Sequence, residues 1–204
     1  MSIRNLSLFA MAAAVLFLNA CGSDPHRIDP AGNDGLVTTG DINPKDWQIA
    51  AEKSINSIVE SGVLNRNDGR KSVIMVSQVK NSTTQHINTR ILTDKIRQAL
   101  LRTGKAVTTT AVGGEGPDDA ASKQVRDLRD SEMFDQKTVQ QMGTAVAPDM
   151  SLAGEIVQEK YNEGRTRESY YFFHMTLTDL KTGLAVWEDN AEVLKQGTRP
   201  ALGF

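Results

Sequence analysis

The sequence predicts an α/β fold of the mixed α+β kind: a small mixed sheet of four to five strands with helices packed on it, ending in an antiparallel meander. Two observations carry this prediction. Residues 73–110 show a strand pattern, an amphipathic helix pattern and a second strand pattern in succession, which is the order of a β-α-β unit. Residues 150–189 then show three strand patterns separated by polar turns, which is the order of a meander.

The first helix is expected to begin at Asn43 or Asp46 and to end at Gly62, since apolar residues recur between them at helical spacing. Residues 73–79 are apolar nearly throughout, as in a strand covered on both faces. An apolar stripe at helical spacing follows and ends at Gly104. Residues 106–110 then form a short β-branched strand, reached by a crossover that we expect to be right-handed.

In the second half, residues 113–117 read as a glycine-rich loop, and the acidic pair at 118–119 favours the start of a helix. Asp135 is expected to cap another helix, which Pro148 ends. Strands are predicted at 150–158, 170–178 and 184–189, with a polar turn over 161–168. The second of these strands should place four large side chains on one face: Tyr171, Phe173, Met175 and Leu177.

The N-terminus has the pattern of a lipoprotein signal peptide over residues 1–20. An apolar run at 6–18, too short to span a bilayer, precedes Leu-Asn-Ala-Cys, which resembles a bacterial lipobox with Cys21 as the lipidated residue. The alternative is an ordinary cysteine after a cleaved signal. Residue 22 is Gly rather than the Asp that commonly retains such lipoproteins in the inner membrane, so the resemblance implies the outer membrane, on its periplasmic face. Residues 21–45 read as a lipid-anchored flexible linker and 196–204 as a flexible tail.

The sequence shows no pattern typical of an enzyme, a metal site or a cofactor site. The histidines at 26, 86 and 174 have no partner at ligand spacing, and the loop at 113–116 lacks the Lys-Ser/Thr of a phosphate-binding loop. Residues 21–204 carry 22 basic against 25 acidic groups, a charge that argues against an electrostatic nucleic-acid binder. We therefore expect a binding protein without catalytic residues, cofactor or nucleic-acid partner.

A family resemblance rests on four segments. Asp-Trp opens the helix at 46, Lys-Asn-Ser-Thr follows the strand at 73–79, the next helix reads Thr-Asp-Lys-Ile-Arg-Gln-Ala-Leu-Leu-Arg-Thr-Gly, and Lys-Thr-Gly-Leu-Ala-Val-Trp closes a hairpin at 181–187. With the lipobox and linker, this order resembles the penicillin-binding protein activator LpoB family over most of residues 46–195, which we take as the globular domain.

The resemblance implies a fold like the N-terminal domain of TolB and a monomeric, non-enzymatic outer-membrane lipoprotein. Such a protein binds and activates a class A penicillin-binding protein, a bifunctional peptidoglycan synthase, by docking on a small accessory domain. The better-known members carry a longer, Pro-rich tether, from which this short linker departs. The alternative function is a structural or assembly lipoprotein of an envelope complex, TolB-like or curli-secretion-like.

Two surfaces are candidates for partner binding. Tyr170 and Phe172 should point away from the core set if their strand alternates, near Arg165 and Arg167 in the predicted turn. The alternative is that Tyr170 and Phe172 pack under a helix. The second candidate is the polar loop from Asn81 to His86.

Overall fold

The computed structural model describes residues 29, 40–110, 120–141 and 143–198. All helices and strands described here lie within the contact unit Gly35–Phe204. In chain order the elements are α2 (Pro44–Ser61), β1 (Ser72–Ser82), α3 (Thr89–Arg102), β2 (Ala106–Thr108), α4 (Ala120–Asp127), the 3₁₀ turn η1 (Leu128–Asp130), β3 (Met150–Glu163), β4 (Thr166–Asp179) and β5 (Ala185–Thr198).

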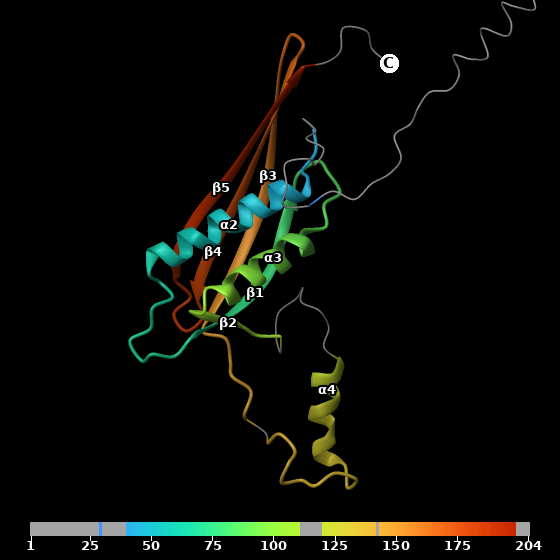
Figure 1. Ribbon diagram of the computed structural model, residues 1–204, viewed down its shortest axis with the longest axis vertical. Coiled ribbons are helices and arrows are strands. Elements are labelled where there is room, and N and C mark those ends of the chain that lie inside the picture. Colours follow the sequence, from blue (N-terminus) through green and yellow to red (C-terminus); the bar gives the residue numbers. More distant parts are fainter. Residues whose placement is uncertain (1–28, 30–39, 111–119, 142, 199–204) are drawn as a thin grey trace, which may run out of the picture. The chain divides into compact units, whose positions relative to one another are not determined.

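The strands form one sheet in the order β2-β1-β3-β4-β5, with α2 and α3 running across it (Figure 1). β1 pairs parallel to both β2 and β3, while β3, β4 and β5 pair antiparallel. The mixed α/β fold, the β-α-β unit formed by β1, α3 and β2, and the closing meander are therefore confirmed. No helix in the described part of the chain is both long and apolar enough to cross a membrane.

Local sequence explains where α2 begins and ends. The Asn43 side chain accepts hydrogen bonds from the first-turn backbone N–H groups, and the Asp46 carboxylate accepts the N–H of Asn43 at 2.8 Å, which completes a capping box. Pro44 occupies the first turn, where its missing N–H costs nothing. Gly62 ends the helix with a φ of 73°, a left-handed conformation that glycine adopts without strain.

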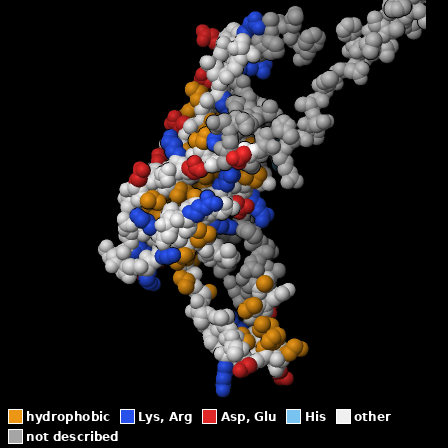
Figure 2. All heavy atoms as spheres, viewed as in Figure 1, with side chains coloured by type: hydrophobic (Ala, Val, Ile, Leu, Met, Phe, Trp, Pro, Cys, Tyr) orange, Lys and Arg blue, Asp and Glu red, His pale blue; other side chains and the backbone are white. Residues whose placement is uncertain are grey.

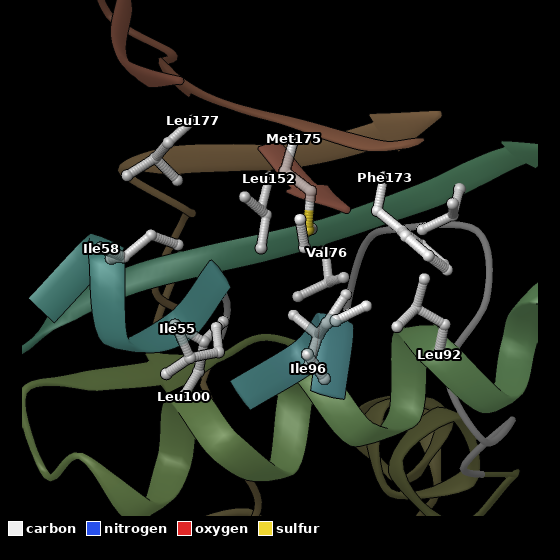
Figure 3. Close-up of a cluster of buried hydrophobic side chains, with 14 of the residues drawn as sticks. Ile55, Ile58, Val76, Leu92, Ile96, Leu100, Leu152, Phe173, Met175 and Leu177 are labelled. Atoms are coloured by element: carbon white, nitrogen blue, oxygen red, sulfur yellow. The ribbon is translucent and has the colours of Figure 1, made fainter. Parts of the chain in front are cut away.

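The hydrophobic core lies between these helices and one face of the sheet. Figure 3 shows Ile55 and Ile58 of α2 and Leu92, Ile96 and Leu100 of α3 directed at Val76, Leu152, Phe173, Met175 and Leu177 of the strands. The predicted inward set on β4, which includes Tyr171, is confirmed, since none of its four side chains is more than 3% exposed. Burying one such side chain fully contributes about 1.5–3 kcal/mol.

The expectation that β1 is covered on both faces was wrong. Ile74 and Val76 are buried, whereas Val73 and Met75 between them are only half-buried. Both helices that contact the sheet extensively lie on the Ile74 side. The apolar run in β1 therefore reflects its central position between β2 and β3, and the second face of the sheet has no helical cover in the described part of the chain.

The strands of the meander are longer than predicted. β3 continues to Glu163 and β4 begins at Thr166, so the expected polar turn at 161–168 is mostly strand, reversing at Gly164. β5 continues to Thr198 and so takes in the first three residues of the expected tail. Side chains at this end of β3 are exposed on both faces, which leaves no apolar alternation to indicate a strand.

The helix expected after Asp135 was also wrong, since the described residues of 131–149 form turns. Side chains bind the carbonyl groups there: Arg129 Nε donates to the carbonyl of Gln140 at 2.7 Å, and Gln136 Nε2 to that of Ser131 at 2.7 Å. The glycine-rich loop at 113–117 and the acidic pair at 118–119 lie outside the described residues.

Candidate functional site: an open sheet face and the junction with the linker

A row of aromatic side chains follows β4 on the face of the sheet that none of the described helices covers. Tyr170, Phe172 and His174 are half-buried and alternate with the fully buried Tyr171 and Phe173. The ring centroids of Tyr170 and Phe172 lie 6.3 Å apart, and those of Phe172 and His174 lie 6.2 Å apart with the rings within 3° of parallel. The alternative that Tyr170 and Phe172 pack under a helix does not hold among the described elements.

We define the open face by the residues around this row on three neighbouring strands. They are Glu155, Val157, Glu159 and Tyr161 of β3, Glu168, Tyr170, Phe172 and His174 of β4, and Glu188, Asn190, Glu192 and Leu194 of β5. This set holds five glutamates and neither lysine nor arginine. The helix side of the domain differs, because basic and acidic side chains are interspersed there (Figure 2).

The glutamates interact directly with the aromatic row. Burial, followed by the neighbouring Glu192 carboxylate, raises the pKa of the Tyr170 hydroxyl. Glu188 Oε1 lies 3.7 Å from His174 Nε2, and His174 Nδ1 lies 2.8 Å from Asn190 Oδ1. Lys80 Nζ donates a hydrogen bond to Glu155 Oε1 at 2.7 Å, and this bond lowers the pKa of the Glu155 carboxyl group. The open face is therefore an apolar stripe bordered by carboxylates.

On the opposite side of the same strands, the end of the predicted linker is bonded to the domain. The Tyr171 hydroxyl donates to the carbonyl of Gly40 at 2.7 Å and accepts from the Nε2 atoms of Gln85 and Gln158, each at 2.8 Å. Burial raises the pKa of this hydroxyl to about 12. The Ile42 N–H donates to Gln85 Oε1 at 3.2 Å. Gly40 and Ile42 are thus hydrogen-bonded to residues of the folded domain.

A buried ion pair completes this junction network. Lys195 Nζ lies 2.5 Å from Asp46 Oδ2, and the two side chains are 5% and 8% exposed. The same Nζ donates to the carbonyl of Asp41 at 2.7 Å. One lysine near the end of β5 therefore binds both the first turn of α2 and the chain that leads into it.

The junction borders a groove of about 460 Å³ on the helix side of the sheet. Its lining residues are Asp41, Ile42, Trp47, Gln85, His86, Ile87, Asn88 and Ile91. In the described ranges, no group of three or more His, Cys, Asp or Glu residues could hold a metal ion. The groove is open and partly apolar, and it offers a second surface for a partner.

The structure separates the sequence-predicted site residues. Tyr170 and Phe172 lie together on the open face, but Arg167 pairs with Asn162 and Gly197 in the register that faces the Tyr171 side. Arg165 lies in the turn after Gly164. Of the predicted patch, Tyr170 and Phe172 therefore lie on the open face, whereas Arg165 and Arg167 do not belong to it.

The second predicted surface is also divided. The Asn81 side chain shapes its own loop, donating to the carbonyl of Gln85 at 2.8 Å and accepting from the N–H of Thr83 at 3.0 Å. His86 lines the junction groove. Cys21 lies outside the described residues. Sequence reasoning missed both glutamates of β5. Glu188 lies within the strand predicted at 184–189, where alternation places it on the open face, and Glu192 lies beyond the predicted end.

Comparison with known proteins gives one family. The model of the family described as peptidoglycan-synthase activator LpoB matches residues 46–193, more than two thirds of the chain. Similar solved structures include the LpoB C-terminal domains from Salmonella enterica (18% identity, TM-score 0.42) and Escherichia coli (17%, 0.42), each covering 72% of this chain and 98% of that one. The NMR structure of E. coli LpoB is 15% identical with a TM-score of 0.40, covering 88% of this chain and 84% of that one. A search of curated proteins gave no match.

Proposed function

The chain belongs to the peptidoglycan-synthase activator LpoB family, and from that premise we propose that it binds and activates a class A penicillin-binding protein. It acts from the periplasmic face of the outer membrane, to which a lipid on Cys21 anchors it. It performs no catalysis itself, and it docks as a monomer on an accessory domain of the synthase. Activation then regulates peptidoglycan synthesis through binding energy alone.

The observation that supports docking is the aromatic row of the open face, which no described helix covers. Monomeric domains rarely leave a contiguous apolar stripe uncovered, and Tyr and Trp are enriched among residues that dominate binding energy. Tyr170 and Phe172 sit at the centre of this stripe, flanked by exposed apolar side chains on both neighbouring strands, Tyr161 (55% exposed) and Leu194 (61% exposed). We assign the partner contact to the open face.

The test reconstitutes synthesis with the full chain in detergent. Each class A penicillin-binding protein of the source organism is supplied with lipid II, and peptidoglycan crosslinking and chain extension are measured with and without the chain. Saturable binding and stimulation of one synthase is the expected result. If none of them binds the chain or is stimulated by it, the proposal fails.

Two matched variants locate the contact. Tyr170→Ala with Phe172→Ala removes the centre of the open face, whereas His86→Ala with Ile91→Ala removes two exposed side chains of the junction groove. We expect the first to abolish stimulation and the second to retain it. The opposite result would move the contact to the groove.

Anchoring and assembly state are tested separately. Cys21→Ser should lose incorporation of radiolabelled palmitate and leave the outer-membrane fraction. The mass of the detergent-solubilised chain should be that of a monomer. A ring or other stable oligomer would instead favour the alternative of a structural subunit in an envelope complex.

A further inference from the structure

We infer that the open face binds a basic surface, one in which lysine and arginine side chains surround an apolar centre. The inference rests on the proposed function for the identity of the partner, a peptidoglycan synthase, and adds the chemistry of the surface that this partner presents. It follows from the arrangement of charge on three strands.

The pairing of the strands places the glutamates on both sides of the aromatic row. Glu159 of β3 lies beside Tyr170, Glu192 of β5 beside Phe172, and Glu155 of β3 beside His174. β3 and β5 are two strand spacings apart, about 10 Å, which is close to the Debye length at 0.1 M salt. The carboxylates on the two strands therefore act together as one negative field around an apolar stripe.

The negative charge of the open face indicates which kinds of partner can bind there. A second copy of the chain would bring the five glutamates of one open face against the five of the other, and like charges across an interface cost several kcal/mol. Anionic lipid and nucleic acid are repelled for the same reason. A basic protein surface instead gains charge complementarity at the rim and buries Tyr170 and Phe172 at the centre.

The glutamates of the open face differ in whether a cation of the chain already lies beside them. Within the set, Glu155 has a close cationic neighbour, Lys80, while the Glu188 side chain is 58% exposed beside a histidine. Glu192 is also exposed. The β5 side of the rim, formed by Glu188 and Glu192, is therefore where we expect incoming cations to bind.

The experiment compares two charge-reversal variants of the full chain in detergent. Glu188→Lys with Glu192→Lys reverses the β5 rim, and Glu52→Lys with Glu60→Lys reverses two exposed carboxylates of α2 with the same change in net charge. Affinity for the synthase that the wild-type chain stimulates is measured at about 50 and about 200 mM salt. The β5 variant should bind at least about tenfold more weakly and lose most of its salt dependence, while the α2 variant should stay within about twofold of wild type. Equal effects of the two variants would overturn the inference.

A second measurement separates this inference from the proposed function. A soluble peptide alternating lysine and tryptophan is titrated into the isotope-labelled chain, and amide chemical shifts are followed by NMR. Shifts centred on Tyr170, Phe172 and His174 support the inference even if no synthase binds. Shifts confined to the helices, or none, overturn it even if a synthase is stimulated. Binding of isolated peptidoglycan that the β5 variant abolishes would also overturn it, by assigning the open face to a polysaccharide.

Discussion

Replacing Lys195 with methionine should destabilise the domain by about 3–5 kcal/mol, because it leaves the Asp46 carboxylate buried without its cation. At the observed 2.5 Å separation, the attraction between the two charges is about 6–7 kcal/mol for an effective dielectric constant of 20. Desolvation of the two ions offsets most of that gain, so the intact pair contributes little net stability. Removing one partner loses the attraction and keeps the desolvation of the other. The expected loss is a large share of the 5–15 kcal/mol typical of a whole domain.

Urea unfolding followed by far-UV circular dichroism measures this loss for Lys195→Met, Asp46→Asn and the double variant. Asp46→Asn keeps an oxygen that can still accept the N–H of Asn43, so it tests the charge more than the capping box. The decrease in unfolding free energy for the double variant should be smaller than the sum of the two single decreases by at least about 2 kcal/mol. Lys53→Met, an exposed lysine of α2, should change stability by less than about 0.5 kcal/mol. A loss below about 1 kcal/mol for Lys195→Met, or strict additivity, would refute the reasoning.

Three further predictions concern single residues. Tyr171→Phe should cost about 1–3 kcal/mol in urea unfolding, because the Gly40 carbonyl loses one of its donors and the Nε2 atoms of Gln85 and Gln158 lose the hydroxyl as acceptor. Burial raises the pKa of the Tyr171 hydroxyl to about 12. The stability that this hydroxyl contributes is therefore complete below pH about 10 and should be lost as the pH rises from about 10 to about 12. A stability difference between wild type and Tyr171→Phe that does not change with pH over this window would contradict the prediction. Gly154→Ala should lower the unfolding free energy by about 1–3 kcal/mol, since its Cβ would lie 3.2 Å from the carbonyl oxygen of His174, and an unchanged melting temperature would argue against a close approach there. Arg97→Met should raise the unfolding free energy by about 1 kcal/mol or more, because the buried Nε and Nη1 atoms of Arg97 have no hydrogen-bond partner in the described structure; a loss of stability would show that they have one.

Periodicity predicted the elements that pack against the core. The apolar spacing in α2 and α3 and the alternation from Tyr171 to Leu177 in β4 arise from burial on one face, so they can be recognised from the residues alone. Where the ends of β3 and β4 pair, residues 159–163 are exposed and residues 166–168 are exposed or half-buried, so no pattern there distinguishes strand from loop.

Contacts between distant parts of the chain left no local signal. Tyr171 and Gly40 are 131 residues apart, and Lys195 and Asp41 are 154 apart, so the junction network could not be predicted from spacing. Alternation along β4 fixes where Tyr170 and Phe172 point, so the face on which they lie could be predicted from the sequence. Three of the five glutamates lie outside the predicted strands, because β3, β4 and β5 are all longer than the sequence pattern indicated: Glu159, Glu168 and Glu192.

The junction network also determines how the domain bears mechanical load. Tension entering the folded unit along the chain first meets the bonds of Gly40 and Asp41 to Tyr171 and Lys195, which lie on β4 and β5. A pull on the chain before Gly40 is therefore carried by the sheet before it reaches the first turn of α2. Because β4 and β5 also carry the open face, an anchor and a bound partner pulling in opposite directions would stress the same pair of strands and spare the helices.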